Sequence, residues 1–424
     1  MTTEHDHLVT ALATGAGRAL LDGLAALDAP PGPAQQRRLR DVHGDALVLL
    51  ALRVAEARAR AAERFPDADR LFFVPELLEQ ATAHPVAARR ARRIAEMYAT
   101  AVVLDLGCGA GSDLTRTALA GLSVRGVERD PLAAALARVN LRAVGGDGNV
   151  IGGEFPACPL PNHEVIIADP GRRVGPRRAA GTRRLIRPED LSPRPADLRP
   201  VLAAAAGWCV KWGPGLDLDH EALSGPGCLL EGMSVLDYDV ELVSWNGVVR
   251  EAAFWGGALS RPGTSRRRAT VLSGPVSDVV AAEYGSAGEE PPASIAPPGP
   301  WILEPDGAVL RAGLLNDLAR ERNWSLLAHG IAYHSAQEPS RDALARSWRR
   351  IDSLPWSRRG LQDALTAHRA GRVVVKTRGF PLSPEEVVRQ LRFEGDREIV
   401  VFLHRDGEAH TAHLTLPLHR GESS

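Results

Sequence analysis

The amino-acid sequence predicts a mixed α/β protein with a helical N-terminal region, a central parallel sheet and a small C-terminal α+β domain. Short apolar runs alternate with helical stretches over residues 99–275, the pattern of parallel strands joined by crossover helices. Residues 276–300 are rich in Pro, Gly, Ser and Ala, which is typical of a linker. They separate the sheet from residues 301–416, whose pattern indicates a second domain.

Length and composition limit the class of protein. A chain of 424 residues is long for one core and favours two or three domains. Its 44% hydrophobic and 24% charged residues are typical of globular proteins. With a formal net charge of −1, any nucleic-acid contact would need a local basic patch.

The first residues carry acids and histidines where a signal peptide has a basic head, and the longest apolar runs fall short of about 18 residues. We therefore expect a cytoplasmic protein without a membrane span. The four cysteines lie far apart and form no CxxC pair. This spacing argues against a disulfide scaffold and against a metal site.

Residues 1–98 are predicted to be helical. Asp45–Phe65 and His84–Ala99 are rich in Ala and Arg and repeat apolar residues every three or four positions. Pro66 and Pro75 interrupt the pattern between them. We expect this region to be a helical leader without a nucleotide site of its own.

Residues 99–275 contain successive strand candidates. They are Val102–Leu106, Val124–Glu128, Val150–Ile151, Val165–Ala168 and Gly207–Trp212. Two β-patterned runs then flank Asn246-Gly247, a dipeptide that favours a two-residue hairpin turn. The run "RRRATVLSG" is a further strand candidate. The sequence thus predicts a parallel sheet that ends in an antiparallel hairpin.

The C-terminal region alternates strand and helix signals. "LSPEE" indicates a helix start with Ser383 as the N-cap and Pro384 at the first position. "RDGE" indicates a hairpin by its Asp-Gly pair. These signals predict a small α+β domain over 301–416.

The first strand leads into a glycine-rich turn. Asp105 precedes Gly107, Gly109 and Gly111, and such glycines let the backbone approach a ligand beside the free N–H groups of a helix start. A dinucleotide site has GxGxxG spacing, and Asp105 would repel a pyrophosphate but attract a cation. S-adenosylmethionine carries an ammonium and a sulfonium and no phosphate. The turn therefore favours this cofactor.

Later strand ends carry further acids. Glu128 can accept hydrogen bonds from both ribose hydroxyls, with Asp130 as the alternative. Glu154 is a candidate acceptor for the adenine amino group. Asp169 and Pro170 follow the fourth strand, at the sheet edge where open α/β folds bind ligands.

Together these segments resemble the successive motifs of class I S-adenosylmethionine-dependent methyltransferases. The resemblance implies a Rossmann-like seven-stranded sheet, with S-adenosyl-L-methionine as cofactor. Most of residues 70–416 resembles bacterial methyltransferases that carry a C-terminal THUMP-like domain, through the segments "EQAT", "DPGRR", "VKWGPGLD", "VSWNGVVREAAFW", "LEPDGAVLRAG" and "VVVKTRG".

The resemblance implies that Asp169 to Arg173 meet the methyl acceptor, with Asp169 and the Pro170 carbonyl orienting it as candidate catalytic groups. Methyltransferases that act on amino groups commonly have a second proline and an aromatic residue here. This chain has Gly171 and Arg172 instead, which leaves the acceptor atom open. An arginine can stack on a base or bind a phosphate.

Residues 172–199 contain nine arginines against three acids. Such a segment would bind a polyanion, or it is a solvated loop. Arg172 and Arg173 are candidate substrate-binding residues. Lys211 is a third candidate, and a structural ion pair is the alternative for it. Cys158 and Cys209 could act as nucleophiles, but we expect them to pack in the interior.

THUMP domains help RNA-modifying enzymes to hold tRNA, so the resemblance implies an RNA partner. Lys376 and Arg378 are candidate phosphate contacts, or they cap a strand. We therefore expect a methyltransferase that acts on an RNA base in tRNA or rRNA. The alternatives are a protein or small-molecule acceptor, and a module that binds cofactor or RNA without catalysis.

Overall fold

The computed structural model describes residues 3–27, 29–172, 191–213, 215, 224–225, 228–234, 236–261, 266–287 and 290–418. The chain forms two compact units. The first comprises Met1–Val240, Arg250–Pro262 and Gly274–Val280, and the second comprises Glu241–Val249, Gly263–Ser273 and Ala281–Ser424.

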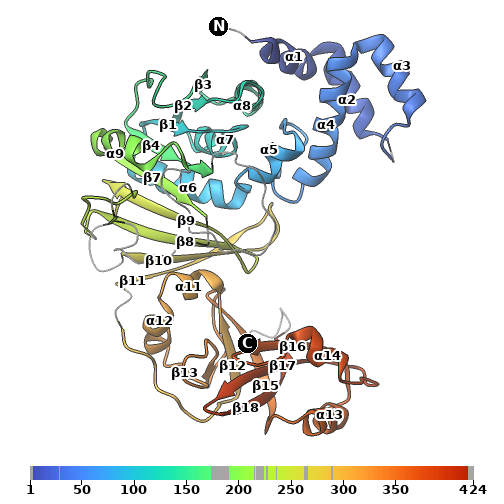
Figure 1. Ribbon diagram of the computed structural model, residues 1–424, viewed down its shortest axis with the longest axis vertical. Coiled ribbons are helices and arrows are strands. Elements are labelled where there is room, and N and C mark those ends of the chain that lie inside the picture. The colour runs from blue at the N-terminus through green and yellow to red at the C-terminus, as the bar shows by residue number, and fades with distance from the viewer. Residues whose placement is uncertain are drawn as a thin grey trace. The chain divides into compact units, whose positions relative to one another are not determined.

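The described part of residues 1–98 is helical, as the sequence predicted. Figure 1 shows the first four helices grouped together, followed by two more that lead to the sheet: α1 (Glu4–Ala13), α2 (Gly15–Ala25), α3 (Pro33–His43), α4 (Asp45–Ala61), α5 (Pro75–Gln80) and α6 (His84–Met97). Buried side chains of α1, α2, α4, α5 and the segment between α4 and α5, among them Val9, Leu21 and Phe72, form one core with Leu136 and Val139 of a later helix.

None of the described helices is by itself long and apolar enough to cross a membrane. Only α1 and α2 taken together meet the length and composition criterion, and a bend of 63° separates them.

The central sheet is wider than the sequence predicted. The seven expected strands are β1 (Val102–Leu106), β2 (Ser123–Glu128), β3 (Gly148–Gly152), β4 (Val165–Ala168), β7 (Gly207–Trp212), β8 (Tyr238–Trp245) and β9 (Val248–Gly257). The further strand candidate "RRRATVLSG" forms β10 (Arg267–Ser273), and β11 (Val280–Ser286), which the sequence did not predict, extends the sheet to nine strands in the order β11-β10-β8-β9-β7-β4-β1-β2-β3. β11 lies within residues 276–300, so this segment is not wholly a linker.

The hairpin between β8 and β9 has the turn that its sequence predicted. Asn246 and Gly247 have φ angles of 51° and 79°. Two consecutive left-handed residues are what a type I′ turn requires. The hairpin places β9 antiparallel to β7, with Cys209 opposite Trp255.

Helices cover the parallel strands. α6 packs on β1, β4, β7 and β9 through Ile94, which lies in a core with Val103, Ile167 and Cys209. The remaining helices of this region are α7 (Ser112–Leu119), α8 (Pro131–Ala143) and α9 (Pro195–Ala204), and a short pair, β5 (Gly171–Arg172) and β6 (Leu191–Ser192), lies between β4 and α9.

The second unit contains a seven-stranded sheet in the order β13-β14-β12-β15-β18-β17-β16. Its strands are β12 (Trp301–Pro305), β13 (Ser325–Leu326), β14 (His334–Ala336), β15 (Ala345–Pro355), β16 (Ala370–Arg378), β17 (Arg397–Asp406) and β18 (Ala409–Pro417), and its helices are α11 (Gly307–Arg311), α12 (Leu315–Glu321), α13 (Arg358–Ala367) and α14 (Pro384–Arg389). α14 begins with the predicted Ser383 cap, which forms a capping box with Glu386.

Candidate active site

Parallel register brings the candidate residues of the strands to one edge of the sheet. Leu106 at the end of β1 pairs with Val127 of β2 on one side and with Ala168 of β4 on the other. Ala168 in turn pairs with Val210 of β7. The residues that follow these positions, Glu128, Asp169 and Lys211, therefore emerge side by side around the glycine turn.

The glycine turn needs glycine at three places. Gly107, Gly109 and Gly111 have φ angles of 79°, 56° and 84°, which residues with a Cβ rarely adopt. At Gly111 a Cβ would also lie 3.3 Å from Cβ of Ala137 in α8. The turn thus combines left-handed backbone with close helix packing.

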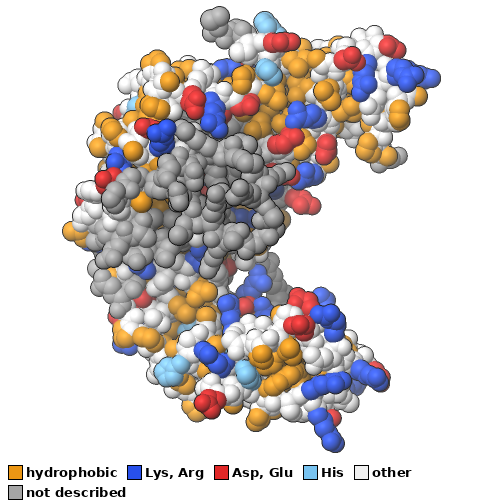
Figure 2. Space-filling view, in the orientation of Figure 1, with side chains coloured by type: hydrophobic (Ala, Val, Ile, Leu, Met, Phe, Trp, Pro, Cys, Tyr) orange, Lys and Arg blue, Asp and Glu red, His pale blue; other side chains and the backbone are white. Residues whose placement is uncertain are grey.

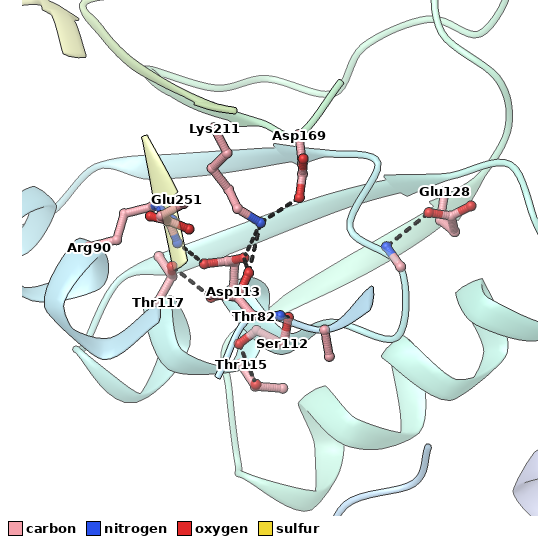
Figure 3. Close-up of polar contacts among 12 residues, drawn as sticks. Thr82, Arg90, Ser112, Asp113, Thr115, Thr117, Glu128, Asp169, Lys211 and Glu251 are labelled. Atoms are coloured by element: carbon pink, nitrogen blue, oxygen red, sulfur yellow. Dashed lines mark hydrogen bonds and ion pairs between the residues drawn. The ribbon is translucent and has the colours of Figure 1, made fainter. Parts of the chain in front are cut away.

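Backbone amides hold the Glu128 carboxylate in place. Its Oε2 accepts from Gly109 N at 2.9 Å (Figure 3), and its Oε1 accepts from Asp130 N at 2.8 Å. Asp130, the alternative candidate, caps α8 instead, because its Oδ1 accepts from Ala133 N at 2.8 Å. Glu128 is therefore aimed at the turn, while the Asp130 side chain stabilises a helix.

A cavity of about 600 Å³ opens over this edge. It is lined by Asp105, the glycine turn, Glu128, Glu154, Asp169 and Lys211, and also by residues 77 and 80–82 from α5 and the segment after it. Its volume lies within the range of small-molecule sites. The N-terminal region, which we expected to stay outside the nucleotide site, thus supplies part of the wall.

Asp105 is buried in this cavity without a complete set of partners. Among the described residues its Oδ2 has no hydrogen-bond partner. Burial, together with the nearby Asp113 carboxylate, raises the pKa of Asp105 to about 8 against the opposing effect of Lys211. A buried carboxyl group in this state would gain from a cationic ligand.

Lys211 lies at the centre of a hydrogen-bonded cluster (Figure 3). Its Nζ donates to Asp169 Oδ2 at 2.6 Å, Thr82 Oγ1 at 2.8 Å and Asp113 Oδ2 at 3.0 Å. Burial lowers the pKa of Lys211, but the Asp113 and Asp169 carboxylates outweigh that effect and raise it. The ammonium group has three N–H donors, and the three contacts use them all.

Asp113 joins this cluster to a second buried pair. Its Oδ1 accepts from Arg90 of α6, and Arg90 also donates to Glu251 of β9. Although burial by itself would raise the pKa of Asp113, Arg90 and Lys211 hold it at about 2. Positive and negative groups alternate from Lys211 through Asp113 and Arg90 to Glu251. Their mutual attraction compensates for the free-energy cost of removing these charges from water.

The other candidates occupy less constrained positions. Glu154 lines the cavity and forms an exposed 3.5 Å contact with Arg129. The Asp169 side chain is 46% exposed. Pro170 lies between Asp169 and Gly171, which both line the cavity. Only the backbone of Arg172 is described, while Arg173 and most of the arginine-rich segment lie outside the described residues.

The two cysteines considered as nucleophiles differ in burial. Cys209 lies in the core beneath the sheet, and burial raises its pKa to about 12. Because the thiolate is the nucleophilic form, this pKa disfavours a covalent role. Cys158 is half-buried, with its Cβ close to Gly153.

Comparison with known proteins shows the family of this chain. Residues 345–417 match the family "THUMP domain-like". Two S-adenosylmethionine-dependent methyltransferases of Mycobacterium tuberculosis, from strains CDC 1551 and H37Rv, are each 33% identical over 348 residues, covering 81% of this chain and 87% of theirs. This chain belongs to the S-adenosylmethionine-dependent methyltransferases. Its cofactor is therefore S-adenosylmethionine.

The fold of this methyltransferase is also found in a solved structure. A putative methyltransferase from Porphyromonas gingivalis W83 matches with a TM-score of 0.74 and 17% identity, covering 99% of this chain and 100% of that chain. The similarity of fold thus extends over nearly the whole chain, including the helical N-terminal region and residues 345–417.

Sequence reasoning missed four residues of the cluster around Lys211: Thr82, Arg90, Asp113 and Glu251. Thr82 belongs to the "EQAT" segment, which marked the resemblance without suggesting a role. Asp113 stands two residues after the last glycine of the turn, a position that could have drawn attention to it. Arg90 looked like one of several arginines on an amphipathic helix.

Lys376 and Arg378 of the THUMP-like domain both contact Glu304. The Lys376 Nζ lies 2.5 Å from Glu304 Oε2, and Arg378 Nη2 lies 4.0 Å from Oε1. Lys376 also lies over the Trp348 ring, and Arg378 over the ring of Tyr333. These side chains connect β16 to β12, so their charges are partly neutralised within the domain.

Proposed function

We propose that this methyltransferase methylates an RNA base, in tRNA or rRNA. The observation that carries the proposal is the match of residues 345–417 to the THUMP domain-like family, in the same chain as a methyltransferase site. The nine arginines of residues 172–199, which follow the acceptor segment, add support for a polyanionic substrate.

We assign cofactor binding to Asp105, Gly107, Gly109, Gly111, Glu128 and Glu154. When bound, S-adenosylmethionine supplies an electrophilic methyl group on a positively charged sulfur. Asp105 fits a cationic cofactor, because its buried Oδ2 lacks a partner among the described residues. Each Glu128 oxygen accepts one backbone N–H and keeps a second lone pair for a ribose hydroxyl.

For the acceptor we assign Asp169 and the carbonyl of Pro170. Asp169 Oδ2 accepts from Lys211, which fixes the side chain and leaves Oδ1 to accept a hydrogen bond from the base. We assign Lys211 a positioning role in place of direct substrate contact, because its donors are already used. Arg172 and Arg173 remain proposed RNA contacts.

The test is methyl transfer to RNA from a strain that lacks the gene. With radiolabelled S-adenosylmethionine, the full-length protein should label this RNA and not RNA from the parent strain, whose target is already methylated. Nucleoside mass spectrometry of both RNAs identifies the product. Label that enters protein or a small molecule regardless of the RNA would overturn the proposed acceptor.

Variants separate the roles within the site. Glu128→Ala should abolish cofactor binding in calorimetry, whereas Asp169→Ala should keep it and lose at least about 99% of methyl transfer. Asp147→Asn, an exposed change outside the cavity, is the control and should alter neither.

A further inference from the structure

A second cavity, of about 870 Å³, lies in the THUMP-like domain beside α13. We call it the arginine cavity. Two acids on the segment after α14 line it, Glu394 and Asp396. It is also lined by four arginines: Arg358, Arg359, Arg369 and Arg392. The lining thus has an excess of two positive charges. Figure 2 shows Lys and Arg side chains projecting from the surface over α13.

Hydrogen bonds fix the frame of the arginine cavity. The Gln362 side chain in α13 donates to Arg392 O at 2.9 Å and accepts from Arg392 N at 2.8 Å. Arg358 Nε donates to Gln390 O at 3.2 Å. The segment that carries Arg392 is therefore held on the helix that carries Arg358, so the two side chains belong to one fixed wall.

The arginines differ in how far their charge is neutralised. Arg369 pairs with Asp396 at 2.7 Å, and Arg359 lies 3.8 Å from Asp363 in an exposed pair. Within the described residues, Arg358 makes no ion pair and keeps both terminal NH₂ groups unbonded, and the Arg392 guanidinium has no partner. These two guanidinium groups are the ones available for an anion.

The placement of Arg358 and Arg359 is unfavourable for the isolated helix. They occupy the first turn of α13, which contains no acid, and positive charge is destabilising at a helix N-terminus. An anion in the cavity would relieve this repulsion.

The surroundings favour RNA over a membrane as the source of the anion. Among the described residues, the large apolar side chains that are strongly exposed all lie at or before Leu310, so none of these borders the cavity for insertion into lipid. Guanidinium planes bind phosphates and stack on bases. We propose that the arginine cavity binds backbone phosphates of the RNA substrate, an inference that rests on the proposed RNA function.

The test measures binding of the full-length protein to unfractionated bacterial tRNA carrying a 3′ fluorescein, by fluorescence anisotropy at several salt concentrations. The double variant Arg358→Gln/Arg392→Gln should raise Kd about tenfold or more and reduce the slope of log K against log salt by about 1.4–1.8, the effect of two lost phosphate contacts. Affinity for S-adenosylmethionine should stay unchanged, which verifies the fold.

The matched control is Arg320→Gln/Arg341→Gln, which removes the same charge from exposed pairs in the same unit. It should change Kd less than about threefold. Equal effects of the two double variants would overturn the inference, because they would reflect net charge alone. Arginine-dependent binding to anionic vesicles or to a phosphopeptide, without binding to tRNA, would overturn it too.

The two proposals fail differently. If the cavity variant binds and methylates RNA as the wild type does, the arginine cavity inference is wrong and the RNA function stands. If tRNA binding depends on Arg358 and Arg392 but no RNA accepts methyl, the arginine cavity binds RNA phosphates while the proposed methyl acceptor is wrong.

Discussion

The Asn140 side chain pairs with the backbone of Phe72 in both directions: Oδ1 accepts from Phe72 N at 2.7 Å, and Nδ2 donates to Phe72 O at 2.9 Å. Nδ2 also donates to Ala110 O in the glycine turn at 2.9 Å. One fully buried amide thus connects α8, the N-terminal region and the glycine turn.

Replacing this amide should destabilise the protein. Asn140→Ala leaves three buried backbone groups without partners, so we expect the free energy of unfolding to fall by about 2–4 kcal/mol. Urea denaturation measures the change. Asn149→Ala, at an exposed position, is the control and should stay within about 0.5 kcal/mol. A similar small loss for Asn140→Ala would show that the three contacts are dispensable.

Asp105→Asn should change stability and cofactor binding in opposite directions. Because the pKa of Asp105 is raised to about 8 by burial, the carboxylate destabilises the fold as pH rises from its unfolded pKa through 8. At pH 9 the neutral amide should therefore increase the free energy of unfolding by about 2–4 kcal/mol. Affinity for S-adenosylmethionine should fall at least about tenfold, as measured by calorimetry. If Asp105→Asn lowers both the free energy of unfolding and the affinity for S-adenosylmethionine, Asp105 has a purely structural role.

Cofactor binding by the wild type should strengthen with pH. Below pH 8 Asp105 binds a proton in the free protein, and a cationic cofactor favours the ionised form, so binding releases that proton. The affinity should rise by up to about tenfold per pH unit between pH 6 and 7.5. Calorimetry in buffers of different ionisation enthalpy measures the released proton. If the cofactor affinity of Asp105→Asn rises with pH as steeply as that of the wild type, the released proton comes from another group.

Thr82 should matter through its hydroxyl group. Thr82 Oγ1 donates to Asp113 Oδ2 at 2.9 Å and accepts from Lys211 Nζ at 2.8 Å. Thr82→Val keeps the shape and removes both contacts, so we expect a loss of about 1–3 kcal/mol in urea unfolding. Thr82→Ser preserves the hydroxyl and should lose less than half as much. Equal losses would point to the methyl group instead.

The sequence predicted the parts of the site that depend on strand order. Asp105, Glu128, Asp169 and Lys211 each lie within one residue of the end of a strand, and parallel register brings such positions together. Arg90 and Glu251 lie 161 residues apart. No local pattern marks a buried ion pair between distant segments, so this part of the cluster required the structure.

The extra strand β11 was missed for a different reason. Val280–Ser286 is exposed or half-buried, and among its seven residues only Val280 and Tyr284 carry the β-branched or aromatic signal of a strand. Its pairing with β10 at the edge of the sheet comes from tertiary context. The composition of this segment therefore predicted a linker, although its backbone pairs with β10 and forms a strand.

The position of β11 also affects how the protein can be shortened. A polypeptide that stopped at residue 275 would retain β10 (Arg267–Ser273) but lose the strand beside it. β10 would then present open N–H and C=O groups over a row of buried residues from Arg268 to Leu272. Such an edge recruits other chains, so this fragment should self-associate, whereas one ending after Ser286 would keep the edge covered.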